Sequence, residues 1–360
     1  MDFALSEEQR MLQDSVSGYL TANCELQRVR DAAEAGSTHD VGLAQGLAEL
    51  GVTGLLIPEE FGGVQLGYLE ATLVAESMGY VAAPVSFIAS NIMAPVALLL
   101  AGSDDQKESL LPALAAGGST VGMAVSTATG ARDSDVPSFN DGTLSGSAMF
   151  ALDAEGAAAF IISDGDGALY LVDAGDVDST KLKTIDRTRG TARLNLDQCP
   201  AQPLPGSVGN TEVLNKVIDV GRVMLAADTL GAAQKMLDDS IAYAKERKQF
   251  NRVIGSFQAV KHMCAEMAAQ LEPCRSLLWY AGHAHDAIPE EARLLSCHSK
   301  AHLSETGKFV ARTATEVHGG MGMTDLLGLH YWFKRIGLNR QLLGTPERVR
   351  HEAAVLQGWA

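Results

Sequence analysis

The feature that most constrains the fold of this chain is a stretch of strand-forming sequence placed between two long helical ones. Up to about Gly118, apolar residues recur at helical spacing. Between Thr120 and about Gln202 the pattern changes to short alternating or β-branched runs such as AFIIS, ALYLV and TARLNL, separated by turn sequences such as NDGT and SDGDG. After the linker CPAQPLPGSVGN, helical periodicity returns and continues to the end. A β insert between helical segments is uncommon and narrows the possible folds.

This order predicts an α+β multidomain protein. The expected domains are an N-terminal helical domain over 1–119, a middle β-domain over 120–207 and a C-terminal helical bundle over 208–360. Within the last domain, three long helices are expected at about 212–250, 255–287 and 290–318, with a fourth amphipathic stretch from about Asp325. Helices of this length and number suit a four-helix bundle.

Composition limits the possible partners and compartment. The 360 residues are 46% hydrophobic, which is ample for a large core. Acidic residues outnumber basic ones 44 to 28, so neither a nucleic-acid backbone nor an anionic membrane surface is expected as a general partner. Five cysteines without CxxC spacing suit a reducing compartment, and we expect the cytoplasm.

Targeting and membrane segments are not expected. The first residues lack a basic start followed by an apolar run. The most apolar stretch, NIMAPVALLLAG, contains a proline and is too short to cross a bilayer.

The first motif that could carry chemistry is TEVHGGMGMTD, residues 315–325, in which Gly319 and Gly320 interrupt a helical pattern. Glycine costs about 1 kcal/mol relative to alanine inside a helix, so the pair marks a connection or a close approach of the backbone. One interpretation is a helix-terminating turn with a left-handed glycine. The other is a site where backbone N–H groups approach a phosphate because no side chain is in the way.

The second motif is ERKQFNRVIGSFQ, at the junction of two predicted helices. It gathers Arg247, Lys248 and Arg252 in an otherwise acidic protein. These cations could bind a diphosphate through Arg247. Alternatively they are the solvated end of a helix, where positive charge complements the helix dipole.

Together with the domain order, the two motifs resemble the acyl-CoA dehydrogenase family of flavoenzymes, and the resemblance covers essentially the whole chain. In that family the Arg of an R-x-x-F motif and the glycine pair of one subunit hold the FAD diphosphate and adenine of its dimer neighbour. The resemblance therefore implies an FAD shared across a subunit interface. The residues implied to bind it are Arg247, Gln249, Phe250, Ile254, Gln258, Glu316, Val317, Gly319, Gly320 and Thr345.

The family's motif for the flavin ring is degraded here. The matching stretches are AVSTATGARDSD, residues 124–135, and SAMFALDAE, residues 147–155. They lack the family's Glu-Pro and place Phe150 where a Trp is expected. The hydroxyls of Ser126, Thr127 and Ser134 could still contact a flavin, although serines on surface loops are usually only solvated.

The family reaction needs a carboxylate that this chain lacks. A glutamate removes the α-proton of an acyl-CoA thioester while the β-hydrogen leaves as hydride to the flavin. By the resemblance, the two family positions for this base are occupied by Leu343, which precedes Gly344-Thr345, and by Gly221, which precedes Arg222. We therefore expect no catalytic residue in this chain.

Nearby acids are expected to serve other purposes. Glu347, Asp219 and Asp228 lie near the two empty positions, but helical spacing puts them on the wrong face or at the wrong depth for proton transfer, which needs a reach of about 3 Å. We expect each of them to cap a helix, form an ion pair or face solvent.

The base and the flavin-ring motif are lost, while the two motifs for the FAD diphosphate are retained. This pattern predicts a non-catalytic subunit that completes the FAD site of a homologous catalytic chain. The resemblance extends to the α2β2 acyl-CoA dehydrogenases of steroid-degrading bacteria. It implies a hetero-oligomer that acts on a bulky, steroid-derived acyl-CoA, and it implies that this chain alone is inactive. Two alternatives stay open. One is an active homo-oligomeric flavoenzyme with a non-standard base or different flavin chemistry, and the other is a flavin-free structural partner.

The remaining side-chain groups are expected to be structural. His298 with His302, and His283 with His285, lack a third ligand, so no metal site is expected. Apolar packing is expected of Met321, Met323, Trp332 and Phe333.

Overall fold

The computed structural model describes residues 4–125, 128 and 136–360. The N-terminal part of the chain is helical, as the apolar spacing predicts. Two of its helices start at capping boxes, Ser6 with Gln9 and Ser103 with Gln106. The elements are α1 (Glu7–Asn23), α2 (Leu26–Ala35), α3 (Val41–Glu49), α4 (Tyr68–Tyr80), the π-helical turn η3 (Ile88–Met93), α5 (Ala94–Ala101) and α6 (Asp104–Ala115).

The middle segment forms a mixed sheet with the strand order β6-β7-β3-β1-β4-β5-β8, while β2 pairs with β3. Alternate residues of β4 face opposite sides, as strand geometry requires. Phe160 and Ile162 belong to a separate hydrophobic core formed by residues of the sheet domain, whereas Ile161 packs against the N-terminal helices. The strands are β1 (Val121–Ala124), β2 (Ser138–Asn140), β3 (Thr143–Leu152), β4 (Ala159–Ser163), β5 (Leu169–Asp173), β6 (Asp178–Lys181), β7 (Thr191–Pro200) and β8 (Gln202–Pro203).

Strand β3 contains an irregularity that matters for the site. Its register against β7 shifts between Ala148 and Ala151, and Phe150 within this shift has a φ of +57°. Such a bulge turns a side chain away from the direction that regular pairing would give it. Phe150 is thereby one of the residues that line a cavity described below.

The C-terminal part is a bundle of long helices, as predicted, with two differences at the helix ends. The first helix stops at Glu246 rather than about residue 250, because β9 (Lys248–Gln249) and β10 (Arg252–Val253) form a hairpin there. The fourth stretch is two helices, because the chain turns between Asn339 and Pro346. The helices are α7 (Thr211–Glu246), α8 (Gln258–Ala287), α9 (Pro289–His318), α10 (Leu329–Asn339) and α11 (Pro346–Leu356).

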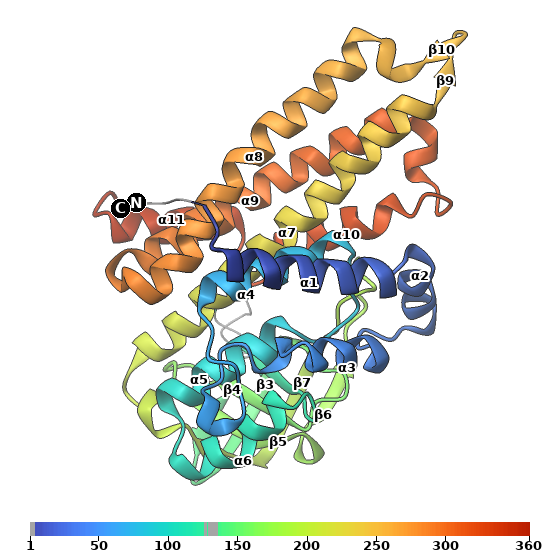
Figure 1. Cartoon of the computed structure of the whole chain (residues 1–360). Helices are drawn as coiled ribbons and strands as arrows, with labels where there is room; N and C mark the ends of the chain where they lie inside the picture. Colours follow the sequence, from blue (N-terminus) through green and yellow to red (C-terminus); the bar gives the residue numbers. More distant parts are fainter. Residues whose placement is uncertain (1–3, 126–127, 129–135) are drawn as a thin grey trace.

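The three domains meet along α7. Figure 1 shows α7, α8 and α9 running side by side, with the β9–β10 hairpin at one end of the molecule and the large sheet at the other. Helix α7 packs on α4 of the N-terminal domain as well as on α9. The predicted architecture of helical domain, sheet domain and helical domain is therefore confirmed.

A buried charge cluster centred on Asp228 joins these domains. The Asp228 carboxylate accepts a hydrogen bond from Arg335 Nη2 of α10 at 2.7 Å and lies 3.0 Å from Nη2 of Arg189, which precedes β7. Arg335 Nη1 also donates to the Ala83 carbonyl of the N-terminal domain at 3.1 Å. Burial raises the pKa of Asp228, but Arg189 and Arg335 outweigh it and hold that pKa below its ordinary value. The expectation that Asp228 forms an ion pair is confirmed.

Two further expectations concern the whole chain. All five cysteines are free thiols, and four of them are buried. Among the described residues, none of the helices combines the length and apolar character needed to cross a lipid bilayer.

Replacing Asp228 by Asn tests the cluster. The substitution leaves Arg335 and Arg189 buried without their carboxylate, so we expect the free energy of unfolding to fall by about 3–5 kcal/mol. Urea unfolding at pH 7 measures the loss. Asp239→Asn is the matched control, since it removes a partly exposed partner of Lys235 on the same helix and should change stability by less than about 1 kcal/mol. Similar losses in both variants would show that the cluster is not a special source of stability.

Candidate functional site

Most residues predicted to bind the flavin lie at one end of the bundle, which we call the hairpin end. It consists of the β9–β10 hairpin, the following turn η7 (Ile254–Ser256) and the glycine turn η8 (Gly319–Met323). His318 at the end of α9 stacks on Tyr243 of α7, with ring centroids 4.6 Å apart. This contact brings the C-terminal ends of α7 and α9, and with them the two sequence motifs, to the same place.

The glycine turn is open. Helix α9 ends at His318, and Gly319 has a φ of +58°. A Cβ atom built on Gly319 or Gly320 would meet no other atom within 4 Å. Gly322 differs, because a Cβ there would lie 2.9 Å from the His318 Cβ. The positive φ requires a glycine here, but the ψ of −140° lies outside the left-handed helical region of the expected cap. The open backbone is compatible with the other interpretation, a phosphate contact.

The cations of the hairpin have different surroundings. The guanidinium of Arg252 lies 3.9 Å from the centre of the Phe257 ring, and Phe250 approaches the same ring edge-on while remaining 88% exposed. In the part of the chain that the structure describes, Arg247 and Lys248 form no ion pair. Arg252 is thus engaged within the hairpin, and Arg247 and Lys248 are available to an anion.

Thr345 is separated from the other nine predicted cofactor residues. It caps α11, where its Oγ1 accepts a hydrogen bond from the Arg348 N–H at 3.4 Å, and α11 lies far from the hairpin in Figure 1. Together with Phe150 and Arg348, Thr345 lines a cavity of about 190 Å³. Two residues that the resemblance connects with a flavin therefore meet here. Ser126, Thr127 and Ser134 lie outside the described residues.

The two empty base positions face each other. A Cβ on Gly221 would lie 2.6 Å from Leu343 Cδ1 and 2.8 Å from Met93 Sδ, so the Leu343 side chain fills the space beside Gly221. Leu343 is fully buried and has a φ of +55°, which is uncommon for a residue with a branched side chain. At the two positions that the resemblance assigns to the family's carboxylate, this chain has apolar packing. Sequence reasoning missed Met93, since nothing in its local pattern marks it.

Two buried cations hold the turn that carries Leu343. Arg222 Nε donates to the Leu343 carbonyl at 2.8 Å. Lys300 Nζ on α9 donates to the carbonyls of Asn339 at 2.8 Å and Gly344 at 3.1 Å. Lys300 is 1% exposed, and burial lowers its pKa to about 7. The sequence signal that marks it is a lysine on an otherwise apolar and small-residue face of α9.

The acids considered as substitute bases are paired, as expected. Burial raises the pKa of Asp219 to about 7, although Asp219 Oδ1 lies 3.3 Å from Arg222 Nη1. Glu347 is exposed and lies 3.0 Å from Arg340 Nη2. A pKa near neutrality suits a general base, but neither acid lines the cavity at Phe150 and Thr345.

The structural expectations for the remaining residues hold only in part. His285 is buried, and its Nε2 lies 2.8 Å from Ser296 Oγ. Trp332 is buried and donates from Nε1 to the Tyr80 carbonyl at 2.9 Å. The packing prediction is wrong for Met323 and Phe333, which are 77% and 40% exposed. Both lie on the outward side of the segment that follows α9.

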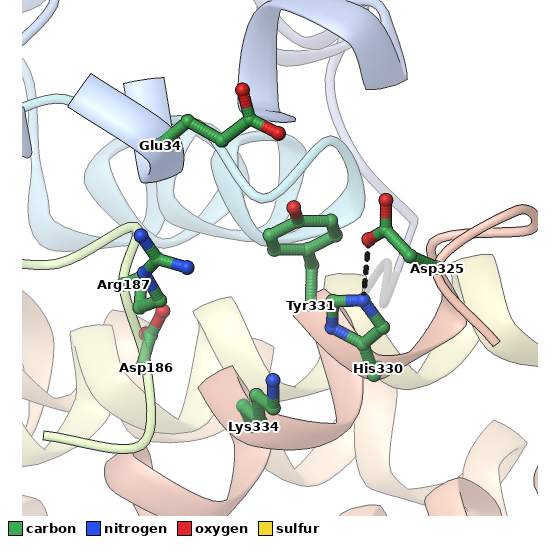
Figure 2. Close-up of a pocket in the computed structure, with 7 residues that line it drawn as sticks. All are labelled: Glu34, Asp186, Arg187, Asp325, His330, Tyr331 and Lys334. Atoms are coloured by element: carbon green, nitrogen blue, oxygen red, sulfur yellow. Dashed lines mark hydrogen bonds and ion pairs between the residues drawn. The ribbon is translucent and has the colours of Figure 1, made fainter. Parts of the chain in front are cut away.

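A second, larger cavity lies where α2, the segment before β7 and the start of α10 meet. Its volume is about 280 Å³, and Figure 2 shows the charged and polar side chains around it. None of the predicted flavin residues belongs to it. Its lining residues are Glu34, Asp186, Arg187, Asp325, His330, Tyr331 and Lys334.

Comparison with known protein families agrees with this geometry. Residues 6–118 match the acyl-CoA dehydrogenase N-terminal domain, and residues 211–354 match the acyl-CoA dehydrogenase C-terminal domain. The chain belongs to the acyl-CoA dehydrogenase family, whose members are flavin-dependent oxidoreductases. The resemblance stated from the two motifs is confirmed.

Individual relatives cover nearly the whole chain. The acyl-CoA dehydrogenase IpdE2 of Mycolicibacterium smegmatis is 28% identical over 343 residues, which are 95% of this chain and 96% of that protein. The solved Tcur3481-Tcur3483 steroid ACAD has a TM-score of 0.88 and 28% identity, over 98% of both chains. The ChsE4-ChsE5 complex from Mycobacterium tuberculosis has a TM-score of 0.91 and 25% identity, with both chains covered completely.

A double-mutant cycle tests the contact between the two base positions. Gly221→Ala should be more destabilising in the wild type than in a Leu343→Ala background, because the smaller side chain leaves room for the new methyl group. We expect a coupling of about 1–3 kcal/mol, measured by urea unfolding of the four proteins. Additive effects would mean that Leu343 does not fill the space at Gly221.

The pH dependence of stability tests the environment of Asp219. Between about pH 4 and 7 the unfolded chain has lost this proton while the folded chain keeps it, so this group makes stability fall as pH rises. Asp219→Asn removes the titration. The unfolding free energy of the variant relative to wild type should therefore increase from pH 4 to pH 7. A difference that stays constant over this range would show that the carboxyl titrates normally.

Proposed function

We propose that this chain is the non-catalytic subunit of an FAD-dependent acyl-CoA dehydrogenase, and that it completes the FAD site of a homologous catalytic chain. The observation that carries the proposal is the packing of Leu343 against Gly221. Both positions from which the family presents its base are closed by apolar contact. The hairpin end, in contrast, keeps open glycines, and its Arg247 and Lys248 form no ion pair with any described residue.

The residues of the hairpin end fit a diphosphate by charge and by access. Both α7 and α9 end here, and the C-terminal end of a helix repels anions. The positive charge must therefore come from side chains, and Arg247 offers a fork of N–H donors that matches phosphate oxygens. Gly319 and Gly320 let the backbone come close without a steric barrier.

Within the proposed enzyme, this chain binds part of the cofactor and the other chain removes the proton. A bound flavin supplies the hydride acceptor. This chain binds and orients the diphosphate through Arg247 and the glycine turn. The α-proton must be removed by a carboxylate within about 3 Å of it, which the catalytic sibling provides.

The relatives support the heteromeric assembly and the substrate class. One similar structure is described as a steroid ACAD, and another is a complex of two differently named chains. On this basis we assign the complex to a heterotetramer in the cytoplasm that desaturates a steroid-derived acyl-CoA. This chain alone is inactive in the proposal.

The cavity lined by Phe150 and Thr345 favours a second candidate. Its volume of about 190 Å³ lies at positions that the resemblance connects with the flavin ring. A flavin ring held there by this chain would make it a homo-oligomeric flavoenzyme with a different reaction, since none of the described residues that line the cavity is a carboxylate.

Purification of the chain alone and after co-expression with a homologous acyl-CoA dehydrogenase chain separates the candidates. The measurements are the ratio of flavin to protein and the desaturation of acyl-CoA with an artificial electron acceptor. Flavin and activity that require co-expression support the non-catalytic subunit. Flavin bound by the chain alone supports the second candidate. Co-purification without any effect on flavin content would leave this chain as a structural partner and overturn both.

Replacing Arg247 by Ala tests the diphosphate contact. A hydrogen bond to a charged group contributes about 1.5–3 kcal/mol, so the Kd for FAD of the co-expressed complex should rise by about 10-fold to 100-fold. Fluorescence titration of the flavin measures it. Arg350→Ala on the exposed face of α11 is the control and should leave the Kd unchanged. An unchanged Kd in Arg247→Ala would rule out this contact.

A further inference from the structure

The segment that follows the glycine turn is bound to helix α2 by Arg30. Arg30 Nη2 donates to the Leu326 carbonyl at 2.8 Å and also to the Asp325 carbonyl. Its Nε lies 3.5 Å from Asp325 Oδ2. The Arg30 side chain is only 19% exposed. A single guanidinium from the N-terminal domain thus binds two carbonyls and one carboxylate of a loop almost three hundred residues later in the chain.

Two further contacts fix the same segment. Gly328 has a φ of +64°, and a Cβ on it would lie 2.4 Å from Leu26 Cδ1, so the backbone lies directly against α2. Figure 2 shows that Asp325 also points toward His330 at the start of α10, and Asp325 Oδ1 is 2.7 Å from His330 Nε2. Asp325 is therefore held from both sides, by α2 and by α10.

Between its two ends, the loop packs closely at Gly322, while Gly319 and Gly320 before it are open. On the α9 side, His318 is buried, and its Nδ1 lies 2.7 Å from the Ala314 carbonyl. On the α10 side, the fixed point is Asp325 with Arg30. The intervening residues include the open Gly319 and Gly320, and Met323 is 77% exposed. Since glycine backbones are flexible, the positions of the backbone N–H groups of Gly319 and Gly320 depend on how the two ends of the loop are held.

We propose that Arg30 is a positioning residue for the cofactor, which holds the glycine turn in the geometry that receives the flavin diphosphate. This inference rests on the proposed function of the hairpin end. Arg30 does not touch the cofactor. It acts by ordering the loop in advance, so that less conformational freedom is lost when the cofactor binds.

The test compares two arginines of the same helix. In the co-expressed complex, Arg30→Met keeps an apolar stem but removes all three contacts to the loop. We expect the Kd for FAD to rise at least tenfold, measured by fluorescence titration. Arg28→Met is the matched control, because Arg28 binds Asp40 with Nε 2.6 Å from Oδ2 and, among the described residues, forms no hydrogen bond or ion pair with residues 319–328. It should bind FAD as the wild type does.

Additional measurements separate positioning from a general loss of structure. The flavin-free melting temperatures of the two variants should be similar, and limited proteolysis near Met323 should be faster only in Arg30→Met. Arg30→Lys, which can reach one carbonyl with a single ammonium, should restore part of the affinity. Equal weakening of FAD binding in Arg28→Met and Arg30→Met would mean that α2 acts only through general stability, which overturns the inference.

The results for Arg247→Ala and Arg30→Met together separate a failure of the proposed function from a failure of the Arg30 inference. If Arg247→Ala leaves FAD binding unchanged, the proposed function fails whatever Arg30 does. If Arg247→Ala weakens binding and Arg30→Met does not, the diphosphate contact stands and the positioning role of Arg30 is wrong.

Discussion

The fold depends on how three domains share one buried carboxylate. Asp228 on α7 binds Arg335 of α10 and Arg189 of the sheet domain, and Arg335 in turn binds the Ala83 carbonyl of the N-terminal domain. A buried charge requires partners in a fixed geometry, because leaving any one of them unpaired is costly. The cluster therefore sets the relative placement of helices and sheet, and with it the position of everything the bundle carries.

The bundle has two ends with opposite character. Near the turn before α11, the interior is closed by Leu343 against Gly221. At the hairpin end, the glycines are open, and Arg247 and Lys248 are exposed without an ion-pair partner in the described part of the chain. This contrast is the physical basis for assigning recognition of a nucleotide tail to this chain and proton removal to another. The contacts between Arg30 and the loop after α9 connect the recognition end to the N-terminal domain.

The sequence predicted the order of domains and the long helices well, because periodicity and caps are local signals. The C-terminal end of α7 and the split of the last helical stretch were missed, since a short hairpin and the carbonyl contacts of Lys300 depend on tertiary packing. The basic motif at residues 246–258 and the glycine motif at residues 315–325 indicated the acyl-CoA dehydrogenase family. The same motifs gave no sign that Thr345 lies apart from Arg247, or that Arg30 contacts Asp325, because both facts depend on residues distant in the sequence.

The fit of Leu343 beside Gly221 also bears on how such a chain can evolve. A glutamate at residue 221 would collide with the leucine, and one at residue 343 would bury a charge where the fully buried Leu343 side chain now packs. Each single reversion would thus damage folding before it regained a base, so regaining one requires coordinated changes at both sites. The packed pair therefore disfavours the appearance of a base at either position by a single substitution.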